Sequence, residues 1–99
     1  MIRTALLAAL TLGAVPALAD SKAQSCQYQA DVVSAVQAAR VARVAERNVE
    51  AHILASEPTW PAQYNNAIPL VAPWVYEQKR RDLKTKDFGA AWNAICLAQ

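Results

Sequence analysis

The sequence predicts an all-α protein, a compact bundle of four to five short helices closed by one disulfide bond. Three observations support this prediction. Residues 20–99 contain sixteen alanines and a single glycine, Gly89, which is a composition typical of helices. Apolar residues recur at spacings of three and four, and no run alternates apolar and polar residues as a half-buried strand would. The two cysteines, Cys26 and Cys96, lie near the two ends of this region.

The first 19 residues have the pattern of a secretory signal peptide. Arg3 supplies a positive charge, residues 5–15 form an apolar run too short to span a bilayer, and residues 17–19 match an A-x-A cleavage site. We therefore expect cleavage after Ala19, one helical domain over residues 20–99, no stable membrane insertion, and a soluble bacterial protein in the periplasm or secreted. A retained anchor helix is the alternative, and Pro16 with the small residues after it favours cleavage.

The two cysteines predict one intramolecular bridge, Cys26–Cys96, because export leads to an oxidising compartment. A loop of about 70 residues would gain on the order of 4 kcal/mol in the chain-entropy model. This gain is comparable to the whole stability of a small domain. No C-x-x-C motif indicates a redox pair, and an intermolecular bridge or a reactive thiol remains the alternative.

The first half of the domain predicts two helices, at about 26–41 and 45–56. Ser25 is a suitable N-cap, and an apolar stripe follows it at i, i+4 and i+8. Val41 and Val44 project away from this stripe, and one straight helix over residues 26–55 would be about 45 Å long. These two facts favour a bend near residues 42–44. One long helix with a second contact face is the alternative, and it would suit a homodimer.

Prolines divide the second half. Pro58 ends the preceding helix, and a short helix can start at Thr59 with Pro61 in its first turn. A third main helix is expected at about 69–81, with Lys79, Arg80 and Arg81 in its last turn, where cations favour the negative end of the helix dipole.

After a connector at residues 82–85, a last helix is expected at about 86–97. Its inward stripe would consist of Phe88, Trp92, Ile95 and Cys96.

Aromatic and basic residues form the candidate interaction surface. A domain of this size cannot bury every ring, so Trp60 and then Tyr76 are expected as exposed anchors for a partner. The basic part of this surface consists of Lys79, Arg80, Arg81 and Lys84. The alternative is a solvated helix end without a partner.

No catalytic, metal or cofactor site is expected. His52 is the only histidine, and Glu50, its nearest carboxylate in sequence, points about 200° away from it on a helix. No nucleic-acid partner is expected either. Residues 20–99 carry nine Lys and Arg against eight Asp and Glu, so the net charge is only +1.

Two families resemble the chain in outline. Residues 25–28, Ser-Cys-Gln-Tyr, resemble the first cysteine region of HdeA-type acid chaperones, which implies a small helical periplasmic chaperone. The terminal W-x-x-x-C of Trp92–Cys96 resembles that of small exported bacterial proteins of unassigned role. The late Cys96 after a pair of expected helices resembles the Rap/Tai immunity proteins of type VI secretion, which implies a protein inhibitor. We therefore expect a protein that acts by protein–protein interaction, as an accessory, inhibitory or immunity-like factor. The alternatives are an acid or stress chaperone and, less favoured, a small enzyme.

Overall fold

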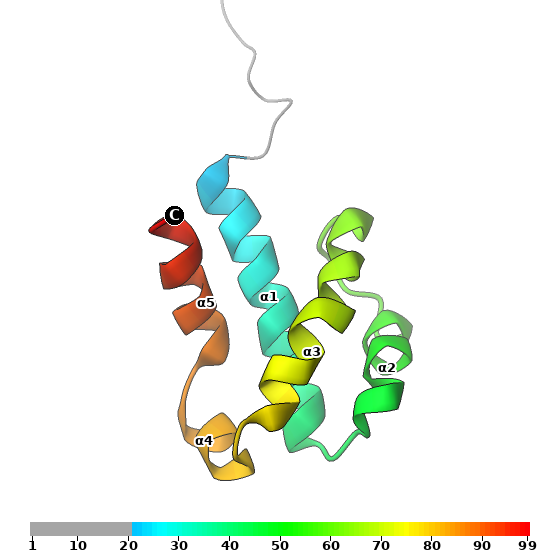
Figure 1. The fold of residues 1–99 in the computed structure, drawn as a ribbon. Coiled ribbons are helices and arrows are strands. Elements are labelled where there is room, and N and C mark those ends of the chain that lie inside the picture. Colours follow the sequence, from blue (N-terminus) through cyan, green and yellow to red (C-terminus); the bar gives the residue numbers. More distant parts are fainter. Residues whose placement is uncertain (1–20) are drawn as a thin grey trace, which may run out of the picture.

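The computed structural model describes residues 21–99, in which all regular secondary structure is helical and no strand occurs (Figure 1). The predicted all-α fold is therefore confirmed. The proposed signal peptide and the cleavage site after Ala19 lie outside the described residues. The elements in chain order are α1 (Lys22–Val41), η2 (Glu46–Asn48), α2 (Val49–Ala55), η3 (Ala62–Asn66), α3 (Ala67–Glu77), α4 (Arg80–Thr85) and α5 (Phe88–Leu97).

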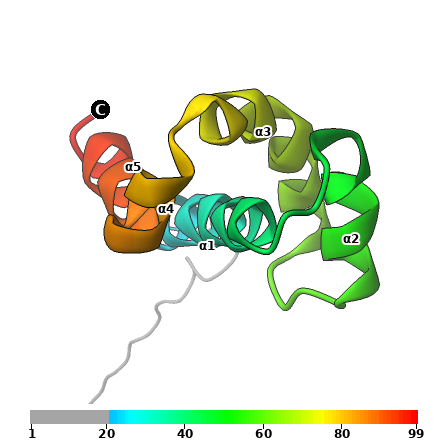
Figure 2. The same cartoon turned by 90° about the horizontal axis from the view of Figure 1, so that it is seen from below.

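Helix α1 is the central element. It begins one turn earlier than the sequence predicts, because the side chain of Ser21 accepts a hydrogen bond from the backbone N–H of Gln24. Seen from below, α5 lies to the left of α1 and α3 lies above it, and these two make its most extensive contacts (Figure 2). Its fully buried side chains include Val32, Val33 and Val36. The hydrophobic core therefore forms where the other helices pack on α1.

The bend after α1 confirms two helices and rules out the single long helix. The backbone N–H of Val44 donates to Ala39 O, and Arg43 adopts a φ of 68°, so the helix ends in a Schellman motif. The second helix starts at Val49, later than predicted, because η2 precedes it. The motif usually has glycine where Arg43 stands, which is why the sequence does not reveal the turn.

The predicted third helix at 69–81 is wrong at both ends. It continues from η3 at Ala67 and ends at Glu77, where Gln78 turns extended. Arg80 and Arg81 therefore open α4, and residues 82–85, expected as a connector, belong to this helix. Leu83 explains the difference, because α4 buries it against α1 to an exposure of 3%. A helix of six residues has little stability of its own, so α4 forms because tertiary packing stabilises it.

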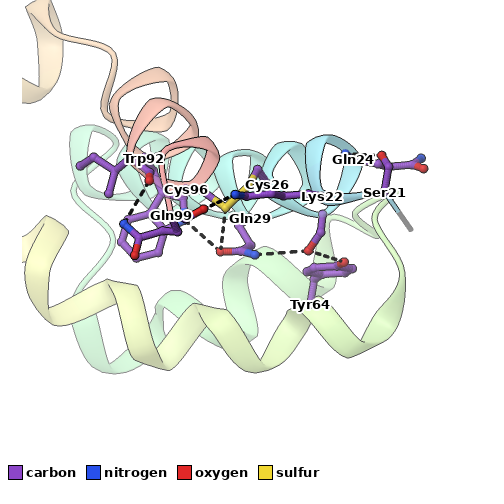
Figure 3. Close-up of a disulfide and its surroundings, with 11 residues drawn as sticks. Ser21, Lys22, Gln24, Cys26, Gln29, Tyr64, Trp92, Cys96 and Gln99 are labelled. Atoms are coloured by element: carbon purple, nitrogen blue, oxygen red, sulfur yellow. Dashed lines mark hydrogen bonds between the residues drawn. A yellow bond between two sulfur atoms is a disulfide. The ribbon is translucent and has the colours of Figure 1, made fainter. Parts of the chain in front are cut away.

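The predicted disulfide is confirmed. Cys26 of α1 and Cys96 of α5 are bonded, with their Cα atoms 5.7 Å apart (Figure 3). The predicted inward position of Ile95 is wrong, since 58% of this residue is exposed. The side of α5 that contacts α1 instead contains Gly89, which is buried against α1, and Cys96, seven positions later. With these two residues facing α1, Ile95 points outward.

In residues 21–99, none of the helices has the length and apolar character that crossing a membrane requires.

Candidate interaction surface

Tyr76, near the end of α3, joins this helix to the end of α1. Its hydroxyl donates to Val44 O at 2.7 Å, and the guanidinium of Arg40 lies 5.4 Å from the centre of its ring. The cation–π contact is typical for an arginine over a tyrosine face. Through these two contacts Tyr76 has a structural role. Its side chain is half-buried, and binding of a partner to the exposed part of the ring remains a prediction.

Gln37 of α1 holds α4 in place, a role that the sequence analysis missed. Its amide nitrogen donates to Leu83 O and to Lys86 O, both at 2.7 Å, and its amide oxygen accepts from the backbone N–H of Phe88 at 3.1 Å. One side chain therefore satisfies three backbone groups of the α4–α5 turn. The only available signal was a polar residue next to the buried stripe of α1, and that signal is too common to identify such a role.

These contacts gather cations at one end of the molecule, where α4 lies against the C-terminal half of α1 (Figure 1). Residues 40–46 and 77–87 contain seven cations and four carboxylates, so this part has a net charge of +3, whereas the rest of residues 20–99 is net negative. We call this surface the basic end. Its cations are Arg40, Arg43, Lys79, Arg80, Arg81, Lys84 and Lys86.

Most of this charge is not neutralised locally. Among the described residues, the ion pair at the basic end is Lys86 with Asp82, at 3.8 Å. Arg80 and Arg81 lie in the first turn of α4, where the positive end of the helix dipole disfavours cations, and not in a last turn as predicted. The Nε atoms of Arg40 and Arg80 are buried without a hydrogen-bond partner. Apart from Arg40, which lies over the ring of Tyr76, these cations thus contribute little to the stability of the fold.

A shallow depression of about 490 Å³ lies beside these cations, between α1 and α4. Its lining is largely apolar and includes Ala38, Val41, Ala42 and Leu83, with Lys84 at its edge. An apolar depression with a charged rim is the usual anatomy of a protein-binding surface.

Burial raises the pKa of Tyr76 above its ordinary value of 10.0. The positive charge of Arg40 lowers this pKa, and the negative charge of Glu46 raises it further. A raised folded pKa means that the unfolded chain loses this proton first as pH rises. The stabilisation is therefore complete below about pH 10 and is lost as pH rises through the folded pKa. We expect Tyr76→Phe to weaken the fall in stability above this pH, as measured by urea unfolding at pH 7 to 11. Parallel profiles for the variant and the wild type would contradict this assignment.

Trp60 lies away from the basic end, beside η3, which contacts the first half of α1. It is half-buried against the core, and its indole N–H donates to Asn65 Oδ1 at 2.7 Å. The structure therefore brings Tyr76, Lys79, Arg80, Arg81 and Lys84 together but leaves Trp60 apart. Arg40, in the last turn of α1, and Arg43, in the turn that follows, join the surface.

His52 is exposed on α2. Within residues 21–99, no three or more His, Cys, Asp and Glu side chains come together as metal ligands would.

Comparison of the chain with protein-family models, with curated proteins and with solved structures finds no match.

Proposed function

We propose that this protein binds another protein through the basic end and acts as an accessory, inhibitory or immunity-like factor. The observation that carries the proposal is the net charge of +3 at the basic end, beside an apolar depression, whereas residues 20–99 together have a net charge of only +1. Such a surface fits an acidic face of a partner. Complementary charge accelerates encounter and selects the partner, and the apolar centre supplies contact area.

The scaffold supports this proposal, since a rigid surface loses little conformational entropy on binding. Gln37 fixes α4 on α1 through three hydrogen bonds, and Tyr76 fixes the end of α3 through its bond to Val44. The disulfide suits an oxidising compartment, so we also propose export, with a signal peptide cleaved after Ala19 and a location in the periplasm or outside the cell. A homodimer remains a proposal as well.

Charge reversal at the basic end tests the proposal. The tagged protein is used to capture partners from the cells that produce it, and the captured protein is purified so that its affinity can be measured directly. We expect the double variant Arg81→Glu, Lys84→Glu to weaken binding at least tenfold, chiefly through slower association, and added salt to reduce the wild-type rate. Both residues are exposed, so the fold should be retained.

The matched control is Lys22→Glu, Arg47→Glu, which makes the same change of charge at exposed positions outside the basic end. We expect its affinity to stay within twofold of the wild type. An equal loss in both double variants would mean that only net charge matters. A partner insensitive to Arg81→Glu, Lys84→Glu would place binding elsewhere on the molecule.

A further inference from the structure

A second surface, distinct from the basic end, has no charged side chains. The sequence contains no Asp, Glu, Lys or Arg in residues 58–76 or in residues 88–99. These two segments supply η3, α3 and α5. Helices α3 and α5 both pack on α1 (Figures 1 and 2), and the ring of Trp74 on α3 lies 5.5 Å from that of Phe88 and 5.7 Å from that of Trp92 on α5. We call the side of the molecule that α3 and α5 present together the uncharged face. Exposed surface is normally rich in charge, so a face without it requires an explanation.

The uncharged face contains both a groove and protruding apolar side chains. The groove, of about 320 Å³, lies between η3 and α3 on one side and α5 on the other. Leu70 stands at its rim with 78% of its surface exposed, and Ile95 of α5 is 58% exposed. The groove lining includes Gln29, Tyr64, Ala67, Leu70, Val71 and Trp92.

The polar groups at the bottom of this groove are already bonded to one another. The indole N–H of Trp92 donates to Gln29 Oε1 at 3.1 Å, and the Gln29 amide donates to Ser25 Oγ at 3.3 Å (Figure 3). The hydroxyl of Tyr64 donates to the same Ser25 oxygen at 3.1 Å. This hydrogen-bond network links α5, α1 and η3 and occupies the polar groups of Gln29, Tyr64 and Trp92. The remaining polar groups of the lining are the amides of Gln63 and Asn66, and the rest is apolar, so an occupant of the groove would be largely apolar.

We infer that the occupant is a second copy of this chain, in a two-fold dimer formed by the uncharged face. A two-fold axis places a surface against itself, so any net charge on it would repel its own copy. The uncharged face meets that condition, whereas the basic end, with its net charge of +3, does not. The face is also self-complementary in shape, since Leu70 projects beside a groove that can receive the Leu70 of the other copy.

The size of the face predicts a weak dimer. Helices α3 and α5 have 11 and 10 residues. Each is about 15 Å long and about 10 Å wide, so the two walls with the groove between them cover roughly 15 by 25 Å. Two such footprints give roughly 750 Å² of total buried area, which is below the about 1,000 Å² that stable specific interfaces exceed. Dimerisation should therefore depend on concentration.

Sedimentation equilibrium of the purified protein tests this inference. Protein concentrations from about 5 µM to about 500 µM cover the range in which small interfaces dissociate. We expect the mean mass to rise from one chain to two, and Leu70→Asp or Ile95→Asp to weaken the dimer at least tenfold. Leu54→Asp is the matched control, since Leu54 is an exposed leucine, at 39%, on α2 and outside the face. It should leave the dimer unchanged.

Two results would overturn the inference. If the protein stays monomeric across this concentration range, the uncharged face does not bind a second copy of the chain. A dimer that survives both Leu70→Asp and Ile95→Asp would use another surface. Circular dichroism spectra and melting temperatures of the three variants would first establish that they are folded. Neither result bears on the basic end, since its charge-reversal variants leave the uncharged face intact.

Discussion

Replacing Cys26 and Cys96 together by alanine is expected to lower the free energy of unfolding by about 4 kcal/mol. The bridge joins residues 70 apart in sequence and so restricts most of the unfolded chain. It also fixes the last turns of α5 to the first turns of α1, where Cys26 is 1% exposed. Since a small domain has a total stability of about 5 kcal/mol or little more, the variant should be largely unfolded well below the melting temperature of the wild type.

Urea unfolding followed by circular dichroism measures this effect. Wild-type protein treated with a thiol reductant is the control, because it loses the bridge and keeps its sequence. Both should show the same shift of the unfolding midpoint. A loss below about 1 kcal/mol would mean that packing of α5 on α1, and not the bridge, closes the molecule.

Gly89→Ala is expected to destabilise the protein by about 1 to 3 kcal/mol, although alanine favours helices more than glycine does. A Cβ atom at position 89 would lie 2.1 Å from Ser34 Oγ and 2.8 Å from Ala30 O. The Ser34 hydroxyl can rotate away, but the backbone carbonyl of Ala30 belongs to α1 and cannot. Helix α5 would have to move outward, which would strain the Trp92–Gln29 hydrogen bond near the disulfide.

A double variant separates the two contacts. Ser34→Ala removes the hydroxyl, so Gly89→Ala combined with Ser34→Ala should recover only part of the lost stability. The remainder measures the clash with Ala30 O. Thermal unfolding of the single and double variants gives both quantities. A Gly89→Ala variant as stable as the wild type would show that α5 does not approach α1 this closely.

The fold class and the disulfide could be predicted because both depend on properties of the whole chain. Composition and apolar spacing specify helices, and two cysteines permit one internal pairing. Helix α4 could not be predicted in the same way. It has six residues and one buried side chain, Leu83, and it forms because Gln37 binds the backbone at its end. Likewise, the turn after α1 has no glycine at Arg43 to reveal it.

The candidate surface was predictable where its residues are neighbours in sequence. Tyr76, Lys79, Arg80, Arg81 and Lys84 lie within nine positions of one another, so their grouping followed directly. Arg40 and Arg43 reach the same surface only through tertiary contacts around Tyr76.

The exposure of Trp60 and of Ile95 also depends on tertiary packing. The sequence does not reveal that Trp60 packs against the core beside Asn65. Nor does it reveal that the contact between Gly89 and α1 turns Ile95 outward. For Ile95, the rotation of α5 about its own axis decides the exposure, whereas Trp60 lies in the loop before η3 and is placed by the packing of that loop.

Site-specific photo-crosslinking tests the proposed function most directly. A benzoylphenylalanine at Ala38, an exposed position that lines the depression of the basic end, is compared with the same group at Ala51, an exposed position on α2. Irradiation in the cells that produce the protein should yield one defined adduct from position 38 and none from position 51, and Arg81→Glu, Lys84→Glu should abolish it. An adduct from position 51 alone, or equal adducts from both positions, would contradict binding through the basic end.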